Sequence, residues 1–120
     1  MNFFETELKK MTAKVSLLKN IKLVGRACIA RLTDTTTVKI MFCTQGCASQ
    51  YSAIHITVLN RTEGKIDEFT IKLLDVWGMH QNLYAWSDRG ETRWAGYYPT
   101  GSDYTKMAQA ISDYLENFAD

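Results

Sequence analysis

Hydrophobic and polar positions repeat with a helical period near both ends of the chain and with a period of two between them. Near the start, apolar residues recur at alternating spacings of four and three, which places them on one stripe of a helix. Asn2 can cap this helix, Glu5 follows as in a capping box, and Asn20 can end it. The stripe consists of Phe4, Leu8, Met11, Val15 and Leu18.

A second amphipathic helix is expected close to the other end of the chain. Thr100 or Ser102 can cap it, and the carboxylate of Asp103 favours the positive end of its dipole. Its apolar residues again recur at helical spacing and form a broad stripe. They are Tyr104, Met107, Ala108, Ile111, Tyr114, Leu115 and Phe118.

Between the two helices the pattern alternates, which predicts antiparallel strands with one apolar face. A polar loop is expected after Cys43, and Glu63-Gly64 is a typical hairpin turn. Asp88-Arg89-Gly90-Glu91 predicts a later turn. The strands are expected at residues 23–32, 38–43, 54–58, 68–73, 83–86 and 92–98.

These elements predict an α+β fold with an antiparallel sheet of five to six strands. When both amphipathic helices pack on one face of the half-polar sheet, the apolar stripes of the helices and the apolar face of the sheet bury one another. Residues 1–120 fit a single domain, which is long enough to bury a core without metal or disulfide bonds.

The sequence favours a cytoplasmic protein. Its first residues become charged too early for the apolar region of a signal peptide, and no segment is long and apolar enough for a membrane span. The cysteines Cys28, Cys43 and Cys47 are odd in number, which disfavours a closed disulfide framework.

Charge is unevenly distributed along the chain. Residues 1–39 hold eight basic and three acidic residues, whereas residues 40–120 hold six basic and ten acidic residues. The basic part indicates a surface that could contact phosphates, and the alternative interpretation is an ordinary solvated helix face beside scattered strand charges. The candidate nucleic-acid-binding residues are Lys10, Lys14, Arg26 and Arg31.

Aromatic residues cluster in the C-terminal half, with two arginines among them. Trp, Tyr and Arg dominate protein interfaces when they are exposed together, and aromatic rings also stack on single-stranded bases. The alternative is that Trp86 and Trp94 form a cross-strand core pair. The candidate partner-binding residues are Trp77, Trp86, Arg89, Arg93, Trp94 and Tyr98.

No catalytic, cofactor or metal motif of a recognised type is expected. Cys43 and Cys47 are four residues apart, and together with His55 and His80 they lack the close pairs typical of a zinc site. A Cys–His hydrolase site could be assembled from Cys47, His80 and Asp75, but the local signatures of cysteine enzymes are missing. Glycine-rich nucleotide-binding motifs are also missing from the sequence.

Four segments of the chain resemble, in the same order, a family of small uncharacterised proteins encoded on bacterial plasmids and conjugative elements. The segments are Met-Asn-Phe-Phe-Glu-Thr-Glu-Leu (1–8), Val-Gly-Arg-Ala-Cys (24–28), Leu-Asn-Arg-Thr-Glu-Gly (59–64) and Asp-Val-Trp-Gly (75–78). The resemblance implies a protein of a mobile genetic element, and anti-CRISPR proteins are similar in size and in lacking motifs.

Two functions follow as hypotheses from this setting. The first is a non-enzymatic inhibitor of a bacterial defence nuclease of the Cas9 type or of its guide-RNA complex, in which the acidic, aromatic C-terminal part contacts the basic channels of the nuclease. The second is a nucleic-acid-binding accessory protein of conjugation or plasmid maintenance that uses the basic N-terminal part.

Overall fold

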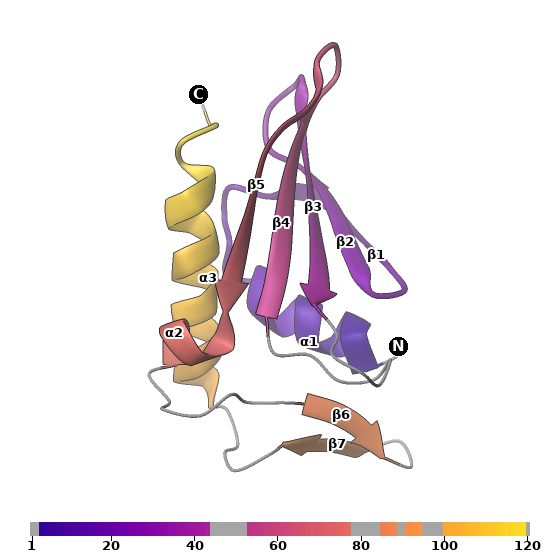
Figure 1. Cartoon of the computed structure of the whole chain (residues 1–120), viewed down its shortest axis with the longest axis vertical. Coiled ribbons are helices and arrows are strands. Elements are labelled where there is room, and N and C mark those ends of the chain that lie inside the picture. The colour runs from indigo at the N-terminus through magenta and orange to yellow at the C-terminus, as the bar shows by residue number, and fades with distance from the viewer. Residues whose placement is uncertain (1–2, 44–52, 78–84, 89–90, 95–99, 120) are drawn as a thin grey trace.

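The computed structural model describes residues 3–43, 53–77, 85–88, 91–94 and 100–119. A helix precedes a five-stranded antiparallel sheet, and a short helix, a two-stranded sheet and a long helix follow (Figure 1). The elements are α1 (Phe3–Thr12), β1 (Lys19–Val24), β2 (Ala27–Arg31), β3 (Thr36–Cys43), β4 (Ala53–Asn60), β5 (Gly64–Lys72), α2 (Leu73–Trp77), β6 (Ala85–Asp88), β7 (Glu91–Trp94) and α3 (Gly101–Leu115).

The five-stranded sheet is a meander in which each strand pairs with the next one along the chain. Its centre is the β3–β4 pair, where Ile40 lies opposite Ile56. Directly opposite residues share a face, so the alternation along each strand gives the sheet one apolar face. The buried apolar residues of that face in these two strands are Val38, Ile40, Phe42, Ile54, Ile56 and Val58.

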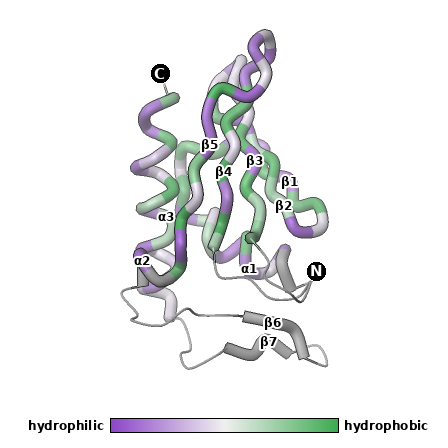
Figure 2. The backbone as a smooth tube through the Cα atoms, in the orientation of Figure 1, coloured by the Kyte–Doolittle hydropathy of each residue, from purple (hydrophilic) through white to green (hydrophobic). Residues whose placement is uncertain are grey.

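Both terminal helices contribute to the core on this apolar face. α1 packs against β1, β2 and α3, and α3 packs against α1 and α2. In Figure 1, α3 runs alongside β5 and α1 crosses behind the lower ends of the strands, and Figure 2 shows hydrophobic and hydrophilic residues alternating along these elements. The expected α+β fold is therefore confirmed. The helices supply Leu8, Met11, Tyr104, Met107, Ala108, Ile111 and Leu115 to the core.

α1 is shorter than the sequence predicts, because it ends at Thr12 and the chain continues in tight turns. The backbone amides of Val15 and Leu18 each donate to the carbonyl three residues earlier, at 3.0 and 3.2 Å. These turns keep a spacing of three, so both side chains remain buried beneath the sheet. Asn20 lies inside β1 at a φ of 53° and does not end the helix.

The first expected strand, residues 23–32, is a hairpin in the structure. Gly25 has a φ of 62°, and the pair Val24–Ala27 flanks a two-residue turn formed by Gly25 and Arg26. Glycine at the first central position with positive φ is typical of a type II′ turn, which matches the twist of hairpin strands. The prediction of one continuous strand here was wrong, because Gly25 interrupts the alternation with a turn.

The turn between β4 and β5 confirms the hairpin expected at Glu63-Gly64. Asn60 accepts hydrogen bonds at its side-chain oxygen from the amide and the hydroxyl of Thr62, at 3.0 and 2.8 Å. Gly64 then enters β5 at a φ of 76°. An asparagine side chain that bonds its own backbone two residues later is typical of such turns.

The last two expected strands form β6 and β7, which are separate from the main sheet. They flank the turn expected at residues 88–91, and the expected strand residues 83–84 and 95–98 lie outside the described residues. α3 begins as predicted, because the backbone amide of Thr100 donates to the carboxylate of Asp103 at 2.7 Å. The expected cap at Asn2 lies outside the described residues.

Candidate nucleic-acid interface

The candidate partner-binding residues of the C-terminal half fall on several elements. Trp77 is the last residue of α2, whereas Arg89 and Tyr98 lie outside the described residues. Trp86 belongs to β6, and Trp94 belongs to β7. The structure therefore places only part of this set together, in the paired strands β6 and β7.

The β6–β7 pairing sets the register of the aromatic hairpin. Trp86 lies opposite Arg93, and Trp94 lies opposite Ala85. Trp86 and Trp94 are therefore not direct cross-strand partners, contrary to the core pair weighed as an alternative. The register instead places a tryptophan and an arginine at directly opposing positions.

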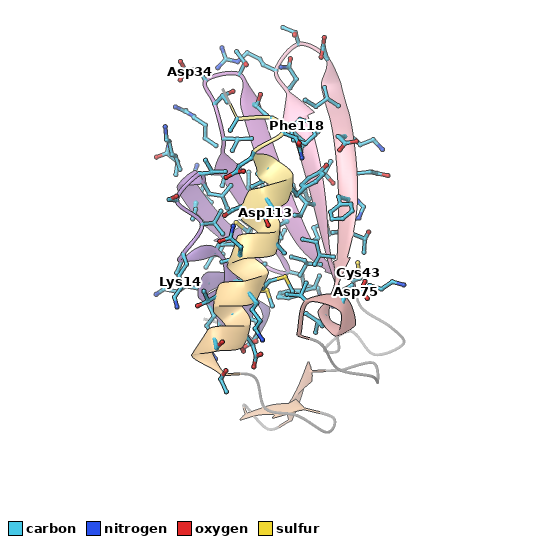
Figure 3. All side chains as sticks on the ribbon, turned by 90° about the vertical axis from the view of Figure 1, so that its left-hand side faces the viewer. Lys14, Asp34, Cys43, Asp75, Asp113 and Phe118 are labelled. Atoms are coloured by element: carbon cyan, nitrogen blue, oxygen red, sulfur yellow. The ribbon has the colours of Figure 1, made fainter. Side chains whose placement is uncertain are left out.

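The candidate residues Lys10 and Lys14 lie on the helix side of the molecule, where both contact α3. Lys14 lies in the turns that follow α1 and donates from Nζ to Oγ1 of Thr105 at 2.7 Å, and Figure 3 shows Lys14 beside α3. Lys10 belongs to α1 and lies 3.4 Å from a carboxylate oxygen of Glu7, and its Nζ is 5.3 Å from the ring centroid of Tyr104. Both lysines thus connect the N-terminal part of the chain with α3.

Arg26 and Arg31 lie elsewhere, in the β1–β2 hairpin. Arg26 is in its turn, and Arg31 is the last residue of β2, opposite Thr37 of β3. The alternation in β2 buries Cys28 and Ala30 and leaves Arg31 on the opposite face. The four basic candidates are therefore split between the helix side and the open side of the molecule.

The outer face of the five-stranded sheet carries no described element. It is the face away from the helices, and the strands in Figure 1 lie in front of α1. Its side chains follow from the register, since Lys22 lies opposite Ile29, Ile29 opposite Lys39, and Lys39 opposite Thr57. We call this surface the open sheet face. Its described residues include Lys19, Lys22, Ile29, Arg31, Lys39, Met41, His55, Thr57, Glu68, Thr70 and Lys72.

The open sheet face is basic. Five of its cations form no ion pair with another residue in the part of the chain that the structure describes: Lys19, Lys22, Arg31, Lys39 and Lys72. Glu68, the one carboxylate among the described strand residues of this face, is 2.9 Å from Nζ of Lys65 and 3.5 Å from Nε2 of His55. The hydrogen bond and charge of Lys65 lower the pKa of Glu68, and His55 contributes in the same direction. Glu68 therefore stays ionised, and Lys65 already balances its negative charge.

Apolar contact area on this face is present but limited. Ile29 is 39% exposed and lies between Lys22 and Lys39 in the register, whereas Met41 is 38% exposed and lies between Ala27 and His55. No aromatic side chain points from this face among the described strand residues, because Phe42 and Phe69 lie on the helix side. Base stacking is thus not provided by the described part of this surface.

Three cations of the open sheet face were not among the residues that the sequence suggested for contact with phosphates: Lys19, Lys39 and Lys72. The signal that could have found Lys39 and Lys72 is the alternation itself, because each occupies a polar position between two apolar ones. Lys19 lies between Leu18 and Asn20 and has no such signal. Lys19 comes to lie opposite Arg31 only because Gly25 and Arg26 form a turn. The uneven charge noted along the sequence thereby becomes a property of β1, β2 and β3, which are neighbours in the sheet.

The cysteines that the structure describes offer no activated nucleophile. Cys28 is fully buried in the core, and burial raises the pKa of its thiol to about 11. Burial also raises the pKa of Cys43, at the end of β3 (Figure 3). Among the described residues, no group of three His, Cys, Asp or Glu side chains is placed to hold a metal ion. Cys47 and His80 lie outside them.

Comparison with known proteins gives no further assignment. No protein-family model matches the chain, and no curated protein or solved structure matches it significantly. Within the described residues, no helix has the length and apolar character that crossing a membrane requires. Functional inference therefore starts from the surface of the molecule.

Proposed function

We propose that the protein is a non-enzymatic nucleic-acid-binding accessory protein of a bacterial mobile element, acting in the cytoplasm in conjugation or plasmid maintenance. The observation that supports this proposal is the open sheet face, where five cations without ion-pair partners lie on a surface that no described element covers. A polyanion is the ligand whose charge complements such a face.

The spacing of these cations favours their joint action. Lys22 and Lys39 occupy one cross-strand row and are separated by β2 alone. Two strand spacings amount to about 10 Å, so a phosphate above β2 would lie about 5 Å sideways from each lysine, within the screening length of about 8 Å at physiological salt. Lys19 and Arg31 extend the surface along a second row.

The chemistry of the face favours backbone contacts over base recognition. Lysines and arginines neutralise phosphates whatever the sequence, and the described residues supply no stacking ring. A single strand that contacts all five cations is expected to bind with a log–log salt slope of about −3.5. Binding should accordingly be weakly selective for sequence and should be lost at high salt.

The test is a titration of a fluorescent mixed-sequence DNA strand, its RNA equivalent and the corresponding duplex, at low and at physiological salt. The double substitution Lys22→Glu and Lys39→Glu should abolish binding at physiological salt. The matched control is Lys106→Glu, which changes an exposed lysine on α3 and should leave binding nearly unchanged. A flat titration of the native protein at low salt, or equal loss in the control, would overturn the proposal.

A second candidate function is inhibition of a defence nuclease of the Cas9 type, or of its guide-RNA complex. It is favoured by the β6–β7 register, which sets Trp86 opposite Arg93 and gathers three of the six candidate residues in one hairpin. Tryptophan and arginine are the residue types that most often dominate protein interfaces.

This candidate is tested by mixing the protein with a purified effector, its guide and a target. Inhibition of cleavage with co-elution is expected, and the double substitution Trp86→Ala and Arg93→Ala should relieve it. Lys22→Glu separates the two functions, because it should weaken nucleic-acid binding without restoring cleavage. Full cleavage with no co-elution would exclude the effector as a partner.

A further inference from the structure

The outer edge of β1 offers unpaired backbone groups to a further strand. β1 is the last strand in the order of the sheet, and no described strand pairs with its outer side (Figure 1). Val24 and Ala27 close the two-residue turn, so they form a hydrogen-bonded pair. Leu23, one residue earlier, takes the other kind of position, and its N–H and C=O point away from β2.

An apolar hollow lies directly beside this edge, between α1 and β1. It has a volume of about 320 Å³ and is lined by Lys9, Thr12, Ala13, Ile21 and Leu23. Ile21 is 39% exposed although its side chain belongs to the face that the helices cover elsewhere. The hollow is large enough for one aliphatic or aromatic side chain of a strand added beside β1.

We infer that the outer edge of β1 binds an extended acidic peptide segment of a partner protein by strand addition, with one apolar side chain of the peptide in the hollow. Backbone hydrogen bonds at Leu23 provide affinity, and the hollow, which accepts one side chain of the added strand, provides selectivity. This interaction lies beyond the proposed binding of nucleic acid, because it uses the edge and the helix side of β1.

Charge complementarity determines the character of the peptide. Lys9 lines the hollow, and Lys19 and Lys22 lie on β1 itself. Residues 19–31, which form the whole β1–β2 hairpin, contain no Asp or Glu. Edge lysines disfavour pairing with neutral or basic strands, and an acidic strand is the one that they attract.

A second copy of the chain is the main competing occupant. Pairing β1 with its own copy would bring two sets of the same cations, from Lys19 and Lys22, to one junction. Like charges across adjacent strands are unfavourable, so the acidic peptide is the better match. Size measurement in solution distinguishes the two occupants.

The experiment is a selection of linear peptides from a random library on the native protein, with the variant Ile21→Glu as the negative bait. Ile66→Glu is the matched control, since Ile66 is 38% exposed on β5. Peptides that alternate acidic and apolar residues should be enriched on the native protein and on the control. Their affinity should fall at least about ten-fold on Ile21→Glu, which corresponds to about 1.4 kcal/mol.

A change in the peptide tests strand addition without any effect on the fold of the protein. N-methylation of every second backbone nitrogen should abolish binding in one register and preserve it in the other, because only alternate amides face β1. Three results would overturn the inference. They are enrichment of basic or helical peptides, no enrichment over the Ile21→Glu bait, and equal affinity of both methylated peptides. A dimer of the native protein that Leu23→Pro dissociates would assign the edge to a second copy instead.

Discussion

Tyr104 of α3 donates the hydrogen of its hydroxyl to Glu7 of α1 at 2.7 Å, although the two residues are 97 positions apart in the sequence. Both side chains are buried, and Glu7 is only 1% exposed. Lys10 lies on the outer side of the same carboxylate at 3.4 Å. The contact therefore joins the two terminal helices. Because the carboxylate of Glu7 is buried and has lost its hydration, it needs these partners to be stable in the folded protein.

Replacing Tyr104 with phenylalanine removes a donor from this buried carboxylate. We expect Tyr104→Phe to lower the free energy of unfolding by about 1–3 kcal/mol, as for a buried polar group left with fewer partners. The matched control is Tyr114→Phe, which removes an exposed hydrogen bond to Asp67 and should cost less. Urea unfolding measures both, and equal losses would contradict the role assigned to the Glu7 contact.

Stability should decrease at alkaline pH. Burial raises the pKa of Cys28 to about 11 and, with the charge of Glu7, also raises the pKa of Tyr104. Both groups keep their protons in the folded state and lose them more readily when unfolded, so their contribution is complete at neutral pH and declines above about pH 9.

Urea midpoints measured from about pH 8 to about pH 11 should therefore fall, and Cys28→Ala should make the fall shallower. The comparison uses the slope with pH, because the substitution also changes core packing at every pH. A midpoint that stayed constant to pH 11 in the native protein would be inconsistent with buried neutral groups.

The two described cysteines should differ in reactivity. Cys28 has no exposed surface, whereas Cys43 is partly exposed at the end of β3. In a Cys47→Ser background, a thiol reagent should modify Cys43 first and reach Cys28 only as the protein unfolds, since reaction requires an accessible thiolate. Mass spectrometry of peptides after timed labelling gives the order, and early modification of Cys28 would contradict its place in the core.

Truncation of an isoleucine should cost more stability on the core face of the sheet than on the open sheet face. Ile56 has no exposed surface and lies between Ile40 and Phe69 in the register. Ile56→Ala is expected to cost about 2–5 kcal/mol of unfolding free energy, because it leaves a cavity. Ile29→Ala, on the open sheet face, should cost less than about 1 kcal/mol. Similar costs at the two sites would argue against the face assignment.

Two glycines should respond in opposite directions to alanine. Gly25 has a φ of 62° in the β1–β2 turn, and Gly101 lies in the first turn of α3, and neither has a neighbour within 4 Å of an added Cβ. Gly25→Ala should destabilise by about 1 kcal/mol or more, because the left-handed conformation strains an alanine. Gly101→Ala should stabilise by up to about 1 kcal/mol. Thermal unfolding of both variants is the measurement.

The fold was largely predictable because its strongest signals are local. The stripes around Leu8 and Ile111, the alternation about Ile40 and the cap at Asp103 each depend on residues only a few positions apart. The end of α1 was not predictable from spacing, because turns that repeat every three residues keep Val15 and Leu18 on the same side as a helix would. Periodicity alone does not distinguish these two conformations.

The candidate site was predicted less well, for a topological reason. The excess of basic residues in the first third of the chain was visible, but its division between two sides of the molecule depends on strand register. Lys10 and Lys14 were grouped with Arg31 by sequence, and the sheet separates them. The hydrogen bond from Lys14 to Thr105, 91 positions away, has no local signature in the sequence.

The pairing of the two terminal helices has a consequence for synthesis on the ribosome. Every strand of the meander can pair with its predecessor as the chain emerges, but the apolar face around Ile40 and Ile56 has only α1 to cover it until α3 has been made. Native closure then waits for residues 101–115, as expected when decisive contacts join distant parts of a chain. Nascent chains lacking that helix should be the species that chaperones recognise.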